Sequence, residues 1–230
     1  MKHHLTRLGL LNTAVVDGVR VTGPARTALD LAREHGFEAG VIACDAVRFR
    51  GLPKQALTDE LLLMWCWPDV TQARAAVDQS DPGAESLAET LLRLFVDGLG
   101  IGKSETQLPV QLRGGVAWCD LRIGCQVFEF DGKIKVLGPD RGGVATRRAE
   151  DVLWDERGRE LDVCAEGLGM SRVRWHDLFG PAREALRQRL LKEYAVTTNR
   201  FGEVLPSHLA ESAARLRAER AARRTRRYSA

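Results

Sequence analysis

The chain has few cysteines and no long hydrophobic run. Its 230 residues include only five cysteines, which are odd in number and scattered, with no CxxC pair. A disulfide framework and a cysteine-based zinc site are therefore not expected. No stretch approaches the roughly 18 apolar residues of a membrane helix, and the first residues show no secretory hydrophobic region. We expect a globular protein of the reducing cytoplasm that makes no use of a membrane.

Charge is nearly balanced overall but unevenly distributed. The formal net charge is only +3, yet seven arginines and a single acid, Glu219, lie between Arg215 and Arg227. A basic tail of this kind is typical of segments that contact phosphates, and the alternative is a solvated terminal helix. The nucleic-acid-binding candidates in the tail are Arg223, Arg224, Arg226 and Arg227.

The hydrophobic pattern divides the chain into three parts. Residues 1–80 predict a mostly helical domain, which begins with a small hairpin over 13–21 and ends near a linker at 81–83. Residues 84–178 predict the order helix, three-strand meander, helix, strand. The expected segments are 84–99, 106–112, 116–123, 126–131, 144–168 and 171–175. Residues 179–230 predict a helical C-terminal extension that carries the basic tail. The fold class is therefore mixed α/β.

Two alternating runs meet at Gly124-Cys125, where glycine in the first central position favours a type II′ hairpin turn. If Ile123 pairs with Gln126, Asp120 lies opposite Glu129, with Cβ atoms roughly 4.5–5.5 Å apart. Asp131 follows on the same face because strand side chains alternate. Carboxylates this close repel one another unless a cation or a proton lies among them. The pattern predicts a metal site on one face, opposite a core face formed by Cys119, Leu121, Ile123, Phe128 and Phe130.

The string Phe128-Glu-Phe-Asp-Gly-Lys133 follows an acid on the preceding strand. With the acids of Glu85–Glu89, the charged run Glu156–Glu160 and the final Gly169–Arg174, it resembles the PD-(D/E)XK nuclease superfamily. The similarity is to the branch of very short patch repair endonucleases, over about residues 84–178. It implies a restriction-endonuclease-like core and Mg²⁺- or Mn²⁺-dependent hydrolysis of DNA phosphodiesters.

The resemblance also implies roles for individual residues. Asp120 and Glu129 would ligate the metal and Glu89 would complete the site, supported by Glu85 one turn earlier. Gln107 matches a glutamine common in the family that contacts a water or a phosphate. The family has a lysine two residues after the glutamate, where this chain has Asp131. The role of the family's lysine would then pass to Lys133 or Lys135, further along the chain.

Each of these residues also has a structural interpretation. Asp131-Gly132 is typical of a turn that ends a strand, and Glu85 and Glu89 can be solvated helix acids. Arg122 can neutralise Asp120 and Glu129 as a salt bridge. The arginines of the long helix either bind phosphates or pair at i,i+4 with its own acids, Glu150, Glu156 and Glu160, and pairing is favoured for most of them. These arginines are Arg147, Arg148, Arg157 and Arg159.

The segment Val19–Ala32 is similar to the body of the type IV abortive-infection antitoxin family. No winged helix is visible before Leu5, so we expect residues 1–80 to form a scaffold or a surface for a cognate protein partner. The leading hypothesis is a metal-dependent DNA endonuclease acting in repair, phage defence or a toxin–antitoxin context. The alternative is a non-catalytic DNA-binding antitoxin or regulator with a degenerate nuclease domain.

Overall fold

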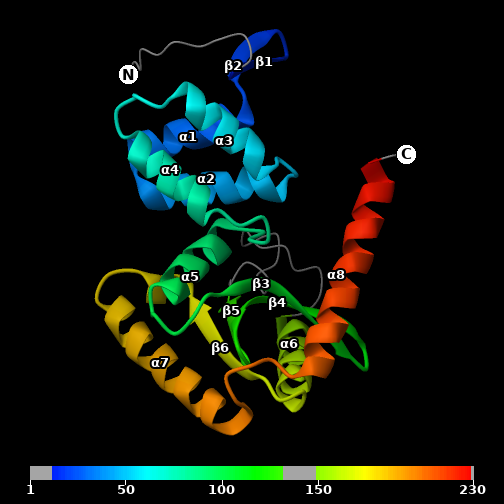
Figure 1. Cartoon of the computed structure of the whole chain (residues 1–230). Coiled ribbons are helices and arrows are strands. Elements are labelled where there is room, and N and C mark those ends of the chain that lie inside the picture. The colour runs from blue at the N-terminus through cyan, green and yellow to red at the C-terminus, as the bar shows by residue number, and fades with distance from the viewer. Residues whose placement is uncertain (1–11, 132–148, 229–230) are drawn as a thin grey trace. The chain divides into compact units, whose positions relative to one another are not determined.

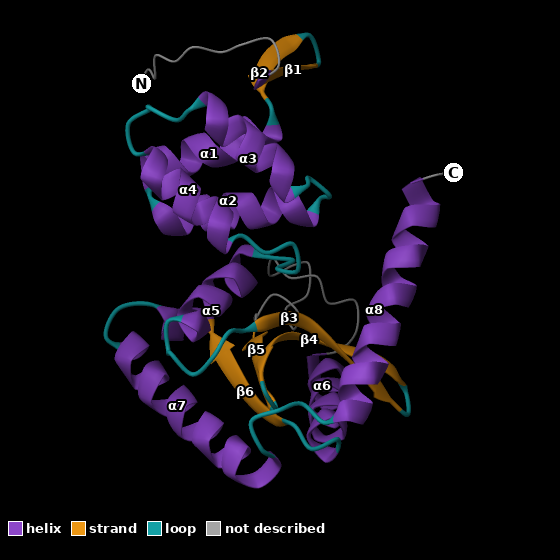
Figure 2. Ribbon diagram, viewed as in Figure 1, coloured by secondary structure: helices purple, strands orange, loops and turns teal. Residues whose placement is uncertain are grey.

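The computed structural model describes residues 12–131 and 149–228, with side chains described over 12–131 and 156–223 (Figures 1 and 2). The chain forms two compact units, one ending at Leu91 and the other beginning at Leu92. No helix in the described part is both long and apolar enough to cross a membrane.

The first unit begins with the expected hairpin. Strands β1 (Thr13–Val16) and β2 (Val19–Thr22) pair antiparallel. Between them, Asp17 (φ 51°) and Gly18 (φ 79°) are both left-handed, as a two-residue turn that follows the twist of the strands requires. This hairpin prediction is confirmed.

Helices make up the rest of the first unit. They are α1 (Pro24–His35), α2 (Phe37–Phe49), α3 (Lys54–Leu63) and α4 (Val70–Gln79), and α1 packs against the other three. Helix α1 begins after Gly23, with Pro24 at its first position, where proline loses no hydrogen bond.

A close helix crossing lies in the core of this unit. A Cβ atom placed on Gly40 of α2 would lie 2.4 Å from the Cβ of Ala32 and 2.9 Å from that of Ala76. Only glycine therefore allows α1, α2 and α4 to approach this closely. The buried residues around the crossing include Leu29, Val41 and Ala73.

One buried carboxylate ties the region of the expected linker to the first unit. Asp45 of α2 is 1% exposed and accepts hydrogen bonds from the Asp81 backbone N–H (2.6 Å) and the Thr90 hydroxyl (2.9 Å). The sequence analysis placed a boundary at 81–83. In the structure, the first unit continues through this segment into helix α5 (Leu87–Asp97).

The second unit is built on a four-stranded sheet of order β3-β4-β5-β6. Strands β3 (Glu105–Leu112), β4 (Gly115–Ile123) and β5 (Gln126–Asp131) form an antiparallel meander. Helix α6 (Ala149–Ala165) follows, and β6 (Gly169–Arg174) then pairs parallel to β5. The predicted order of helix, meander, helix and strand is confirmed. Residues 144–148 of the expected long helix lie outside the described residues.

Two further helices complete this unit, α7 (Ala182–Phe201) and α8 (Ser207–Tyr228), after a 3-10 turn over Trp175–Leu178. Helix α7 packs on β6 and β5, and α8 packs on β3. Side chains of the sheet, α6 and α8 share one core cluster, which includes Val110, Val127, Val163 and Leu209. Strand β5 is buried from Gln126 to Glu129, so its acidic face is covered like its apolar face. A crossover helix between parallel strands produces this double coverage.

Candidate functional site

The hairpin between β4 and β5 has the predicted turn and register. Gly124 has φ 57°, and Cys125 is not among the described residues with positive φ, which fits type II′. The pairs Ile123–Gln126, Arg122–Val127 and Leu121–Phe128 confirm the register. A Cβ atom on Gly124 would lie 2.4 Å from the Glu203 carbonyl oxygen, so glycine also allows a close backbone approach here.

Asp120 lies one residue beyond this paired stretch of β4. Its Oδ2 atom accepts a hydrogen bond from the backbone N–H of Phe130 on β5, at 2.9 Å. In a regular antiparallel ladder this N–H would donate to a backbone carbonyl of β4. The half-buried carboxylate therefore replaces a ladder acceptor and is held beside the backbone of the neighbouring strand.

Glu129, on β5, is buried at 5% exposure. Arg159 of α6 donates from Nη2 to its Oε2 atom at 2.9 Å. A buried carboxylate needs a charged or hydrogen-bonding partner to offset the loss of hydration. The crossover helix α6 supplies that partner. For the arginines of this helix the sequence favoured pairing within the helix over phosphate binding, and a partner on β5 was not expected.

Cys119 is a further member of this cluster. The sequence placed it on the core face opposite the acids, whereas its thiol lies close enough to Glu129 to feel its charge. Burial raises the pKa of its thiol far above the ordinary range. The Glu129 carboxylate raises it further, both by charge and by accepting a hydrogen bond from the thiol. The charge of Asp120 acts in the same direction and that of Arg159 in the opposite one. The four side chains Cys119, Asp120, Glu129 and Arg159 therefore form one electrostatic group.

Asp131 occupies the last position of β5, where the sequence resemblance led us to expect a lysine. It pairs in register with Arg174 of β6, whose Nε lies 3.4 Å from its Oδ2. The side chain thus links two parallel strands at their ends. The described contacts of Asp131 support a structural role.

Arg122 does not neutralise the acidic pair. Its guanidinium pairs with Glu105 of β3 and donates to the Gly124 carbonyl. The alternative in which Arg122 bridges Asp120 and Glu129 is therefore wrong, and Arg159 provides the positive charge instead. The reason is register, because Arg122 lies directly across from Glu105.

The acids of α6 pair across to the sheet rather than along the helix. Glu156 and Glu160 lie 3.7 and 3.1 Å from the guanidinium of Arg172 on β6. The expected i,i+4 pairing is corrected for these two residues, because α6 packs against β6. The side chain of Glu150 lies outside the described residues.

The helix acids Glu85 and Glu89 take part in the start of α5. The Glu89 carboxylate accepts from the Glu85 backbone N–H and from the Ser86 hydroxyl, both at 2.9 Å. The Ser86 oxygen in turn accepts from the Glu89 N–H at 3.2 Å. This reciprocal arrangement resembles a capping box, which satisfies free N–H groups of a helix start. Glu89 belongs to the first compact unit, whereas Asp120 and Glu129 belong to the second.

Gln107 lies on β3 in a left-handed conformation, with φ 53°. Two arginines of α8 donate to it: Arg217 to its carbonyl at 3.2 Å and Arg220 to its Oε1 at 3.4 Å. These hydrogen bonds tie β3 to α8.

The remaining predicted residues lie outside the described residues, at their edge, or in α8 where side chains are not described. Lys133 and Lys135 lie outside the described residues. Arg223 is exposed on α8, and the side chains of Arg224, Arg226 and Arg227 are not described. Over residues 12–131 and 156–223, no three His, Cys, Asp or Glu side chains gather into a group that could hold a metal ion. A three-acid site that includes Glu89 stays a prediction.

Comparisons with known proteins yield no relative: no protein-family model, no curated protein and no solved structure matches the chain.

Proposed function

We propose that the chain is a divalent-cation-dependent DNA endonuclease with its centre at Asp120 and Glu129. The observation that carries the proposal is the placement of these two carboxylates on neighbouring strands, just where the paired stretch of β4 and β5 ends. The order of α5, meander, α6 and β6 around them is the order expected for a PD-(D/E)XK core.

The donor chemistry fits Mg²⁺ or Mn²⁺. Mg²⁺ prefers hard oxygen ligands and is commonly held by one or two carboxylates together with waters and substrate phosphate. Asp120 and Glu129 would supply those carboxylates. A bound cation would activate a water and stabilise the leaving oxygen of the phosphodiester.

Arg159 would serve the site from α6. Its guanidinium contacts Glu129 and, being 40% exposed, has N–H groups available to a phosphate. Arginine matches phosphate geometry through paired donors. Arg159 would therefore orient the phosphate and stabilise its negative charge, a role that the related nucleases give to lysine.

The test is cleavage of plasmid, mismatched and single-stranded DNA with Mg²⁺ or Mn²⁺. Asp120→Asn keeps an acceptor for the Phe130 N–H, and Glu129→Gln keeps one for Arg159, so both variants should fold. Each should lower the cleavage rate by about 10²-fold or more, the size of losing one electrostatic contact in a transition state. Glu166→Gln, at an exposed position after α6, is the matched control. Undiminished cleavage by Asp120→Asn would refute the assignment.

A second function is favoured by the pairing of the acids themselves. Glu129 is neutralised by Arg159 and Asp131 by Arg174, an arrangement that a metal-free DNA-binding protein could also use. Calorimetry with Mn²⁺ separates the two proposals. Stoichiometric uptake that is weakened in Asp120→Asn supports the nuclease, whereas DNA retention without metal uptake supports the non-catalytic regulator.

We also propose a protein partner for the first unit, as its antitoxin-like segment suggests. Leu62, Leu63 and Trp65 at the end of α3 are between 60% and 73% exposed. Large apolar side chains exposed together are typical of interaction surfaces. Charged replacements such as Trp65→Glu should weaken capture of a cognate partner and leave DNA cleavage unchanged.

A further inference from the structure

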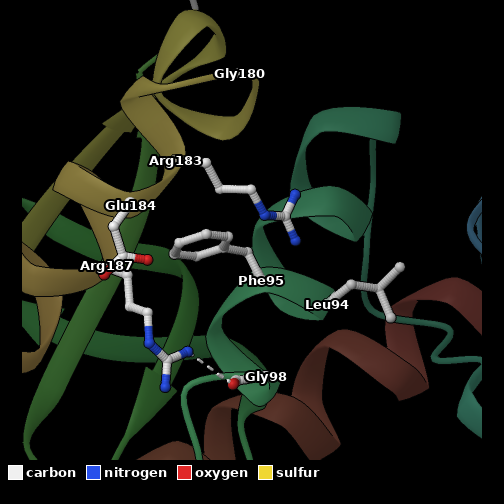
Figure 3. Close-up of a pocket in the computed structure, with 7 residues that line it drawn as sticks. All are labelled: Leu94, Phe95, Gly98, Gly180, Arg183, Glu184 and Arg187. Carbon is white, nitrogen blue, oxygen red and sulfur yellow. Dashed lines mark hydrogen bonds between the residues drawn. The ribbon is translucent and has the colours of Figure 1, made fainter.

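A separate pocket of about 500 Å³ lies within the second unit, between the end of α5 and the beginning of α7 (Figure 3). Its volume is in the range of small-ligand sites. Two arginines from α7 and an aromatic ring from α5 meet in it. The lining residues are Leu94, Phe95, Gly98, Gly180, Arg183, Glu184 and Arg187.

Arg183 lies over an aromatic ring in the pocket wall. Its guanidinium carbon lies 5.0 Å from the centre of the Phe95 ring, and that ring is almost fully buried. Its Nη1 atom also donates to the Leu178 carbonyl at 3.2 Å. Stacking and one backbone contact therefore restrict the guanidinium before any ligand arrives.

Arg187 lies one helical turn further along α7, so the two side chains project from the same side of the helix. It donates from Nη1 to the Gly98 carbonyl at 3.2 Å, the dashed line in Figure 3. This contact anchors it to the end of α5. Two guanidinium groups are thus fixed at one pocket by backbone carbonyls.

Neither arginine is neutralised in the described part of the chain. Other arginines of this unit, such as Arg122, Arg159 and Arg174, contact a carboxylate, but no described carboxylate lies within ion-pair distance of Arg183 or Arg187. Glu184 is the one acid in the lining, and its Oε1 accepts from Gln188 at 2.8 Å. The pocket therefore has an excess of positive charge.

We propose that this pocket binds a phosphate group. Guanidinium groups present paired N–H donors that match phosphate oxygens, and groups that are already restrained lose little side-chain entropy on binding. The site is built without Asp120 or Glu129 and needs no metal. It therefore stands whether or not the chain cleaves DNA. The phosphate can be free, as inorganic phosphate or a nucleotide, or belong to a polynucleotide backbone.

The test is calorimetric titration of the full chain with inorganic phosphate in the presence of EDTA, which removes metal-dependent binding at the acidic pair. One phosphate should bind per chain. The double variant Arg183→Gln with Arg187→Gln should lower the affinity at least tenfold. The double variant Arg74→Gln with Arg113→Gln is the matched control, since both arginines are exposed and lie outside the pocket and the basic tail, and it should bind as the original chain does. Absence of phosphate binding, or equal weakening in the control, overturns the proposal.

A second variant keeps the test decisive if the double variant fails to fold. Glu184→Gln removes the one negative charge of the lining and should tighten phosphate binding; unchanged affinity contradicts the proposal. The source of the phosphate is decided with a labelled oligonucleotide at several salt concentrations. If the ligand is a polynucleotide, the double variant should reduce the slope of log affinity against log salt concentration by about 0.9, the effect of losing one phosphate contact. If the ligand is a free phosphate, the double variant should lose phosphate binding but bind the oligonucleotide with the same affinity as the original chain.

Discussion

The contact between Arg159 and Glu129 joins two elements that are far apart in sequence, β5 and α6. Glu129 is buried, so its charge depends on this guanidinium and on the neighbouring thiol for compensation. Truncating one partner of such a pair leaves the other charge without compensation, which costs more than the pair itself contributes.

We therefore expect Arg159→Met to lower the free energy of unfolding by about 1–3 kcal/mol, the cost of a buried acceptor that loses its donor. Urea unfolding followed by circular dichroism measures the change. Arg157→Met, on an exposed position of the same helix, should change stability by less than about 0.5 kcal/mol. Combining Arg159→Met with Glu129→Gln should recover part of the loss; full additivity would mean that the two side chains are not coupled.

The five free cysteines differ sharply in their surroundings. Burial raises the pKa of Cys44 to about 12, and Cys119 is shifted in the same direction, whereas Cys66 is exposed. Since the thiolate is the reactive form, a raised pKa suppresses reaction at neutral and mildly alkaline pH.

A disulfide reagent applied at pH 8 should therefore label Cys66 rapidly in the native protein. Cys44 and Cys119 should react only after unfolding. Cys66→Ser should abolish the fast phase, as measured by absorbance of the released thiolate. Fast labelling that persists in Cys66→Ser, and also in a variant that lacks the half-buried Cys164, would contradict the burial of Cys44, Cys119 and Cys125.

Among the helices and strands, the β4–β5 hairpin depends most on a single position. Gly124 combines positive φ with a close approach to the Glu203 backbone. A side chain there is strained in conformation and would displace the segment between α7 and α8.

Gly124→Ala should lower the free energy of unfolding by about 1–3 kcal/mol. Thermal and urea unfolding measure this loss. Gly114→Ala is the matched control, since a Cβ atom there meets nothing within 4 Å. Equal stability of the two variants would show that the turn tolerates a side chain.

Element order followed from the sequence because local periodicity and turn residues determine it. Gly124-Cys125 predicted the turn and register of β4 and β5, and Asp17-Gly18 predicted the first hairpin. Ion pairs between side chains of different helices and strands were not predictable in this way. Arg159 and Arg172 meet their acids only because α6 crosses over the sheet, and spacing along one helix carries no information about that crossing. The protonated, buried state of Cys119 depends on the same packing.

The candidate site was predictable to the same extent. Strand alternation predicted Asp120 opposite Glu129 on one face; the described register of β4 and β5 ends at the neighbouring pair Leu121–Phe128, so this juxtaposition stays a prediction. The helix-start role of Glu89 was present in the sequence as Ser86-Leu-Ala-Glu89, the pattern of a capping box. The pocket of Arg183 and Arg187 gave no motif, because it forms only where the end of α5 meets α7.

For the chain taken as a whole, charge is concentrated at the C-terminal end of α8. Replacing Arg223, Arg224, Arg226 and Arg227 by Gln removes four positive charges and takes the formal net charge from +3 to −1. If the tail contacts the DNA backbone, each lost phosphate contact reduces the slope of log affinity against log salt by about 0.9.

The fourfold variant should therefore bind a DNA duplex more weakly, with a slope flatter by up to about 3.6, as measured by fluorescence anisotropy at several KCl concentrations. A control with the same net charge replaces four exposed arginines elsewhere, Arg20, Arg50, Arg74 and Arg113. Non-specific attraction predicts equal weakening in both proteins, because only the total charge matters for it at long range. A defined contact predicts that the tail variant alone loses the steep salt dependence, since counterions are released only where arginines lie against phosphates. Equal slopes in the two variants would therefore exclude the tail as a DNA-binding element and leave the phosphate pocket and Arg159 as the chain's candidates for backbone contact.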